Sequence, residues 1–173
     1  MKDEGFIQIY YGEGKGKTTL ACGNILRALG RNLKVCFVQF LKKELSGEIL
    51  SLQNFNNFYF RSFGSGEWIN ESSIKKQKEL VKEGINFLKE SFEKNNFDIF
   101  VLDEILYALQ FKIINEEELI ELIEKKPKNS ELILTGAHKD FPKLFSYADL
   151  ITNIKKIKHP YDRGIKAREG IEF

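Results

Sequence analysis

A turn rich in glycine and lysine, placed between an apolar run and an amphipathic run, is the feature that most restricts the fold of this chain. From Tyr11 to Thr19 the sequence reads Tyr-Gly-Glu-Gly-Lys-Gly-Lys-Thr-Thr. A phosphate-binding loop needs glycines so that backbone N–H groups can face a polyphosphate, a lysine that reaches its oxygens, and a Ser/Thr hydroxyl for Mg²⁺. All three are present, and a helix after the loop would add its N-terminal dipole. The turn therefore predicts a nucleotide-binding α/β fold.

The loop predicts nucleotide contacts for eight consecutive residues: Gly12, Glu13, Gly14, Lys15, Gly16, Lys17, Thr18 and Thr19. The strict pattern G-x-x-x-x-G-K-[ST] would place a glycine where this chain has Tyr11, so the loop is a variant. A dinucleotide-binding turn would need glycine in place of Lys17, and an acid after the second strand, where Gln39 and Phe40 stand. A flexible turn that binds nothing is the remaining alternative, and the strand–turn–helix setting disfavours it.

Short apolar runs alternate with longer amphipathic ones along the rest of the chain, a pattern typical of a parallel sheet with crossover helices. Strands are predicted over residues 6–11, 34–40, 58–63, 97–103, 132–135 and 150–152. Helices are predicted over residues 17–29 and 73–94, with two more that begin near residues 104 and 116. The tail, residues 155–173, shows no helical periodicity. We predict a single-domain P-loop NTPase-like α/β fold over residues 1–173, with a mostly parallel sheet and helices on both faces.

Composition excludes several classes of protein. The 173 residues suit one domain, and 42% hydrophobic with 30% charged residues is not the composition of a disordered chain. The net charge of +2 is evenly spread, so no basic stripe for nucleic acid is expected. No apolar run approaches the roughly 18 residues of a membrane span, and no signal-type segment opens the chain. Two cysteines cannot form a disulfide framework, which favours the cytoplasm.

Two carboxylates at the end of the most apolar strand predict a metal site. Asp103 and Glu104 follow a nearly continuous apolar run. Together with the hydroxyl of Thr18 they form the predicted Mg²⁺ site, because a nucleotide–magnesium site needs a carboxylate on a strand neighbouring the loop. A strand that leads into a capped helix would look the same without any metal. The reaction also stays open, since a hydrolase and a kinase need further groups that spacing does not reveal.

Further motifs accompany the loop in order along the chain: Arg27-Ala28-Leu29-Gly30, Val38-Gln39-Phe40-Leu41-Lys42, Gly47-Glu48, Trp68, Val101-Leu102-Asp103-Glu104-Ile105-Leu106-Tyr107-Ala108-Leu109, Leu134-Thr135-Gly136, Ala148-Asp149-Leu150 and the tail from Lys158 to Phe173. With these motifs the chain resembles the ATP:corrinoid (cob(I)alamin) adenosyltransferases of the P-loop type, over nearly its whole length.

The resemblance implies a RecA-like parallel sheet, a homodimer, and transfer of the adenosyl group of ATP to the cobalt of a reduced corrinoid, in the synthesis or salvage of adenosylcobalamin. Triphosphate leaves, and the Co(I) nucleophile attacks the ribose 5′-carbon. Because Co(I) carries no proton, positioning and charge stabilisation are the main tasks of the protein. Lys17, Thr18 and Glu104 are the predicted catalytic residues. A reductase, such as a flavodoxin-type protein, is the implied partner.

The resemblance, and their position after the second strand, make Gln39, Phe40 and Glu48 the candidate corrinoid contacts. The corrinoid must lose its axial ligands before reduction to Co(I), which favours a dry aromatic pocket, and Trp68 is the candidate residue for that pocket. A core or dimer-contact role is the alternative for Trp68, and a solvated loop is the alternative for the other three. His138 and His159 are the only histidines, and no zinc-type cluster is indicated.

The chain departs from the family pattern at four positions: Glu67, Ala137, Asn153 and Arg168. These departures are expected to leave the nucleotide-binding motifs unchanged and to affect the part of the pattern that concerns the corrinoid. They keep two other functions open, a P-loop ATPase or phosphotransferase that cleaves the γ-phosphate, and a regulator that binds nucleotide or corrinoid without catalysis.

Overall fold

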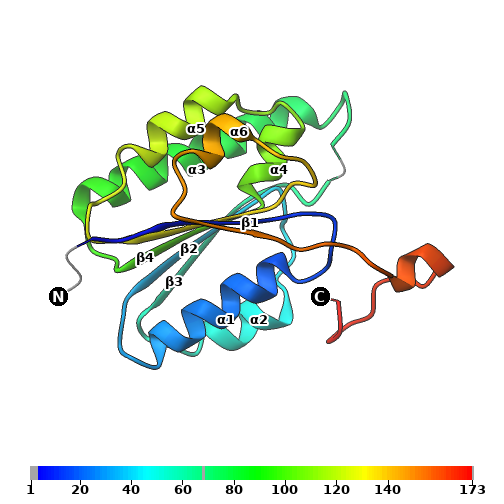
Figure 1. Ribbon diagram of the computed structural model, residues 1–173, viewed down its shortest axis with the longest axis horizontal. Coiled ribbons are helices and arrows are strands. Elements are labelled where there is room, and N and C mark those ends of the chain that lie inside the picture. Colours follow the sequence, from blue (N-terminus) through cyan, green and yellow to red (C-terminus); the bar gives the residue numbers. More distant parts are fainter. Residues whose placement is uncertain (1–3, 68, 173) are drawn as a thin grey trace.

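The computed structural model describes residues 4–67 and 69–172 and is built around one six-stranded sheet (Figure 1). The strands are β1 (Ile7–Tyr11), β2 (Val35–Phe40), β3 (Phe58–Phe63), β4 (Ile99–Asp103), β5 (Glu131–Thr135) and β6 (Leu150–Asn153). They lie in the order β3-β2-β4-β5-β1-β6, and every pairing is parallel.

Helices cover both faces of the sheet. They are α1 (Lys17–Leu29), α2 (Gly47–Leu52), α3 (Ile74–Lys94), α4 (Ile105–Gln110), α5 (Glu116–Ile123) and α6 (Pro142–Phe145), followed by a 3₁₀ turn, η1 (Pro160–Arg163). Figure 1 shows α1 and α2 on one face and α3 to α6 on the other. Over the described part of the chain, every helix is too short or too polar to cross a lipid bilayer.

The direction of each crossover explains which face its helix covers. Parallel strands are joined almost always by right-handed crossovers. From β1 to β2 and on to β3 the chain moves one way along the sheet, so α1 and α2 fall on the same face. From β3 onwards it moves the other way, so α3 to α6 fall on the opposite face. In sheets with such a reversal, ligands bind at the carboxyl ends of the strands beside it, so this is where a ligand is expected here.

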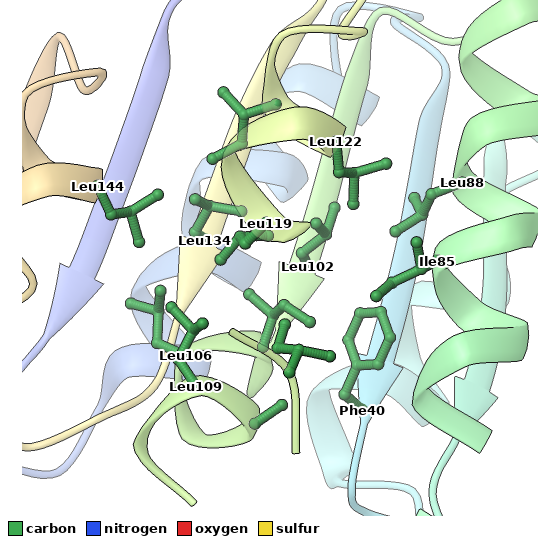
Figure 2. Close-up of a cluster of buried hydrophobic side chains, with 14 of the residues drawn as sticks. Phe40, Ile85, Leu88, Leu102, Leu106, Leu109, Leu119, Leu122, Leu134 and Leu144 are labelled. Carbon is green, nitrogen blue, oxygen red and sulfur yellow. The ribbon is translucent and has the colours of Figure 1, made fainter. Parts of the chain in front are cut away.

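Two hydrophobic clusters fill the space between the sheet and its helices. The larger cluster joins α3, α4, α5 and α6 to the sheet, as Figure 2 shows for Phe40 beside Ile85 of α3 and for Leu134 beside Leu119 of α5. The smaller cluster joins α1 and α2 to the other face. Side chains alternate between the two faces along a strand. In β2, Cys36, Val38 and Phe40 thus belong to the larger cluster, and Val35 and Phe37 to the smaller one.

The structure confirms the α/β class and the predicted strands to within a few residues, and α1 begins and ends where its periodicity indicates. It adds three elements that the sequence analysis missed. These are α2, α6 and the turn η1, which have only four to six residues each and so carry too little periodicity to be recognised. Cys22 and Cys36 are buried free thiols, and burial raises the pKa of Cys36 to about 12.

Candidate functional site

The phosphate loop connects the end of β1 to the first turn of α1. Gly12 and Gly16 have φ angles of 113° and 109°, in the left-handed region that favours glycine. A Cβ on Gly12 would also lie 2.5 Å from the carbonyl oxygen of Ile154. Gly16 is the N-cap of α1 and has no side chain that could cap it. The first amides of α1 are therefore not covered by a capping side chain, which is the arrangement that anions use at helix N-termini.

Lys17 folds back over the loop. Its Nζ donates to the carbonyl oxygens of Gly12 at 2.7 Å and Gly14 at 3.0 Å. Burial lowers the pKa of Lys17, which the charge of Glu104 opposes and that of Lys42 reinforces. A partly desolvated ammonium group held only by carbonyl oxygens is a strong candidate for binding a phosphate oxygen.

Asp103 is the centre of a hydrogen-bond network beneath the loop. It is fully buried at the end of β4. Its Oδ1 accepts from the hydroxyls of Thr18 at 2.9 Å and Thr135 at 2.6 Å, and its Oδ2 accepts from Nε2 of Gln39 at 3.0 Å. The three donors come from α1, β5 and β2, so the network ties the start of the helix to three strands.

Strand alternation explains why these side chains meet. Asp103 lies two residues after Val101, which belongs to the cluster under α1, and Gln39 and Thr135 stand in the same relation to Phe37 and Ile133. Register pairs Gln39 directly with Asp103. All three polar side chains therefore point to the face that α1 covers. Among them the sequence analysis missed Thr135, although its place at a strand end was a usable signal.

Glu104 lies on the other side of the same strand end, in an ion pair. Lys42 Nζ is 2.9 Å from Glu104 Oε1. Burial and the charge of Asp103 raise the pKa of Glu104, while Lys42 and Lys17 oppose the rise. Burial alone would lower the pKa of Lys42, but the charges of Glu104 and Asp103 outweigh it and the pKa is raised. Glu104 also has φ of 67°, and its backbone N–H donates to Thr135 Oγ1 at 3.0 Å. The sequence analysis did not assign Lys42 to the site.

Further polar groups surround the loop. Glu48, on α2, accepts from the hydroxyl of Thr19 at 2.8 Å. On the opposite side, Tyr107 and His138 share a hydrogen bond of 2.6 Å, and Lys17 Nζ lies 5.9 Å from the centre of the Tyr107 ring. Burial and the charge of Lys17 lower the pKa of His138.

The C-terminal tail returns to the loop. Lys15 Nζ donates to the carbonyl oxygen of Ile171 at 2.7 Å and lies 3.2 Å from Glu172 Oε1. The backbone N–H of Gly14 donates to Ile154 O at 2.7 Å. Figure 1 shows the tail leaving the sheet and turning back (orange to red).

Three of the family departures fall on contacts of the loop or tail. The carbonyl oxygen of Ala137 accepts from Gly12 N at 3.0 Å, and Asn153 Oδ1 lies beside Gly12. Arg168 pairs with Glu172 at 3.0 Å. Glu67 instead pairs with Lys76 of α3, at 3.5 Å.

The structure brings together the loop, Thr18, Asp103, Gln39 and Glu48. Phe40 is fully buried and packs on Gly84 of α3 and on Phe63, in the core that Figure 2 shows. The prediction for Trp68 lies outside the described residues.

In the described part of the chain, the site offers magnesium a hydroxyl and a carboxylate oxygen but no large cluster of acidic side chains. Among the described residues no group of three or more His, Cys, Asp or Glu side chains is placed to hold a metal. Mg²⁺ is ordinarily held by one or two carboxylates together with waters and substrate phosphates, so such a group is not required. The Thr18 hydroxyl and the Asp103 carboxylate, 2.9 Å apart, fit that donor set.

Comparisons with known proteins identify the family of this chain. The family model of the ATP:corrinoid adenosyltransferase BtuR/CobO/CobP matches residues 3–173. The corrinoid adenosyltransferase of Escherichia coli (strain K12) is 28% identical over 173 residues, which cover 99% of this chain and 87% of that protein. The corrinoid adenosyltransferase of Sinorhizobium sp is 31% identical, with 99% and 81% covered.

Among solved structures, the flagellar accessory protein FlaH from Methanocaldococcus jannaschii superposes with a TM-score of 0.58 at 16% identity, covering 87% of this chain and 71% of that one. This likeness supports the P-loop NTPase-like fold alone. The family match spans all but the first two residues, and the relatives align over nearly the full length. The chain belongs to the ATP:corrinoid adenosyltransferase family.

Proposed function

We propose that this protein transfers the 5′-deoxyadenosyl group of ATP to the cobalt of a Co(I) corrinoid and releases triphosphate. The observation that carries the proposal is the phosphate loop with an uncapped α1 and the partly desolvated Lys17, in a chain of this family. These groups are suited to holding a triphosphate while another part of ATP reacts.

The reaction makes one bond and breaks one. The electron pair of Co(I) forms the cobalt–carbon bond to C5′ of the ribose. The pair of the C5′–O5′ bond leaves with the triphosphate. Since no proton is removed from the nucleophile, the reaction needs no general base.

The protein therefore works by positioning ATP and by stabilising charge on the leaving group. Lys17 exchanges the carbonyl oxygens of Gly12 and Gly14 for phosphate oxygens, and the amides at the start of α1 add further donors. Lys15 supplies a second ammonium group at the edge of the loop. Glu13, Gly16 and Thr19 complete the proposed nucleotide contacts.

Magnesium would be held directly by the Thr18 hydroxyl and through water by Asp103, with Glu104 as the second carboxylate of the site. When bound, Mg²⁺ would neutralise charge on the triphosphate. Glu104 already pairs with Lys42 at 2.9 Å, so magnesium would have to compete with Lys42 for its carboxylate. The hydrogen bond to Asp103 holds the Thr18 hydroxyl in place for this role.

For the corrinoid side, Glu48 and Trp68 stay our candidates. Gln39 and Phe40 are both buried, so they would act only through the groups that they contact. The departure at Glu67 is where this side of the site would differ from its relatives, whereas Ala137 contacts the phosphate loop. We also propose a homodimer in the cytoplasm, and a reductase such as a flavodoxin-type protein as the source of Co(I).

The test is incubation with ATP, Mg²⁺ and chemically reduced cobalamin. We expect the absorbance of a cobalt–carbon bond to appear together with one triphosphate per corrinoid adenosylated. Formation of ADP and phosphate, with neither adenosylcobalamin nor triphosphate, would refute the proposal in favour of γ-phosphate cleavage. Tight binding of ATP without any product would favour a regulator.

A further inference from the structure

Asp103 has one acceptor position to spare. A carboxylate offers about four lone-pair sites, two on each oxygen. Oδ1 already accepts two hydrogen bonds, from Thr18 and Thr135, and Oδ2 accepts one, from Gln39. The free site is therefore on Oδ2, the oxygen that faces Gln39.

Gln39 has a free acceptor of its own. The side chain is 1% exposed, and its Nε2 must face the carboxylate because Asp103 can only accept. This fixes the amide orientation, so Oε1 is the other atom on the same carbon. Oε1 is buried and has no hydrogen-bond partner among the described residues. Since buried polar atoms are nearly always paired, such an atom indicates a missing water or ligand.

The two free acceptors belong to side chains that are hydrogen-bonded to each other at 3.0 Å. One water molecule has two hydrogens and can donate to both acceptors, which leaves its oxygen lone pairs free for a cation. Buried waters commonly occupy polar positions of this kind. The Thr18 hydroxyl, the proposed magnesium ligand, contacts the same carboxylate at 2.9 Å.

We propose that Gln39 Oε1 and Asp103 Oδ2 together accept the two hydrogens of a single water that belongs to the hydration shell of the nucleotide-bound Mg²⁺. The inference rests on the proposed function for the presence of Mg–ATP. It gives Gln39 a different task from a corrinoid contact: Gln39 is a positioning residue that orients Asp103 and the cation through water. Metal sites depend strongly on such outer hydrogen-bond partners.

The experiment is calorimetric titration of ATP, without corrinoid, into the wild type and Gln39→Met, once with Mg²⁺ and once with EDTA. Methionine keeps the length of the side chain and removes both polar atoms. With Mg²⁺ we expect the affinity of the variant for ATP to be about 10- to 100-fold lower. With EDTA we expect the affinities to agree within about threefold. Equal losses in both buffers, or no loss in either, would overturn the inference.

Gln77→Met is the matched control. Gln77 of α3 is also fully buried, and its Oε1 is likewise unpaired, but its Nε2 donates to Ser65, at 2.8 Å, instead of to a carboxylate. This variant should bind ATP as the wild type does in both buffers. If it loses affinity for ATP only with Mg²⁺, as Gln39→Met is expected to, the effect is not specific to the Asp103 network and the inference fails.

A crystal structure of the wild type with ATP and Mg²⁺ tests the inference even if Gln39→Met does not fold. We expect a magnesium-bound water within about 3.2 Å of both Gln39 Oε1 and Asp103 Oδ2. A magnesium ion bound with no such water would refute the inference, and a loop that binds no Mg–ATP would refute it together with the proposed function. Formation of ADP in the transfer assay, with the water present, would refute the function alone.

Discussion

Lys17 is the side chain of the loop that we expect to bind the phosphate oxygens most strongly. Its side chain is half-buried, and the charges of Glu104 and Lys42 both act on its pKa. The ammonium group donates to two carbonyl oxygens, at 2.7 and 3.0 Å. Neutral carbonyl oxygens are weaker partners for an ammonium group than phosphate oxygens are. The contacts of the free protein are therefore ones that a triphosphate can replace.

Lys17→Ala is expected to lower kcat/KM for ATP by about 10²- to 10³-fold, the usual effect of removing one donor that stabilises developing charge. Steady-state assays of adenosyl transfer measure the loss. Lys82→Ala, which removes an exposed lysine of α3, is the control and should change kcat/KM by less than twofold. Near-normal turnover of Lys17→Ala would contradict the assignment of the loop.

At the scale of elements, α3 and α1 use glycine for different reasons. Gly84 of α3 faces the sheet, where a Cβ would lie 2.6 Å from the Phe40 ring and 3.0 Å from the Phe63 ring. Gly23 of α1 is exposed, and a Cβ there would meet no atom of the described residues within 4 Å. Close packing requires the first glycine, whereas nothing in the packing requires the second.

The two glycines therefore respond to alanine with opposite signs. Gly84→Ala gains about 1 kcal/mol of helix propensity but overpacks the core at a cost of about 1–3 kcal/mol, so we expect a loss of up to about 2 kcal/mol. Gly23→Ala should raise the free energy of unfolding by about 0.5–1 kcal/mol. Urea unfolding measures both. A Gly84→Ala protein as stable as Gly23→Ala would show that α3 does not pack on Phe40 as described.

At the scale of the whole molecule, the last described residues of the chain contact the phosphate loop. Glu172 lies 3.2 Å from Lys15, on a tail that reaches the loop from beyond β6. The hydrogen bond from Arg168 lowers the pKa of Glu172 to about 2. Because this pKa lies below the ordinary value of about 4.5, the stabilisation by the ion pair is fully present above that value and is lost as the pH falls towards 2. If Lys15 binds the triphosphate as proposed, the ionised Glu172 competes with it throughout the neutral range.

Glu172→Gln is expected to lower the KM for ATP by about two- to fivefold, which is the scale of an exposed ion pair. The reason is that Lys15 loses its carboxylate partner and is free for phosphate. Glu169→Gln, in the same exposed tail, is the control and should leave the KM unchanged. A KM that rises in Glu172→Gln would mean that the tail contributes to ATP binding instead of competing with it. Measurements at low ionic strength will show the effect best, because salt screens exposed charges.

The sequence alone determined the local elements and the loop. The spacing of apolar residues predicted α1 at its observed bounds, and Gly12 to Thr19 predicted the phosphate loop, because both depend on neighbouring residues. The shortest elements, α2, α6 and η1, were missed for the same reason, since four to six residues show no periodicity. Thr18 could be named from the loop pattern, Asp103 from a strand end, and Glu48 from the family resemblance and its position after the second strand. The hydrogen-bond partners of these residues could not be named.

Only the tertiary structure decided those partners. Thr18, Gln39 and Thr135 meet at Asp103 because crossover handedness puts α1 over one face, and because strand order and register bring β2, β4 and β5 together. The pairing of Lys42 with Glu104 and the burial of Phe40 have the same origin. The hydrogen bonds to Asp103 join residues 32 to 85 positions apart, and their formation depends on the packing of the whole sheet, which no local sequence pattern reveals.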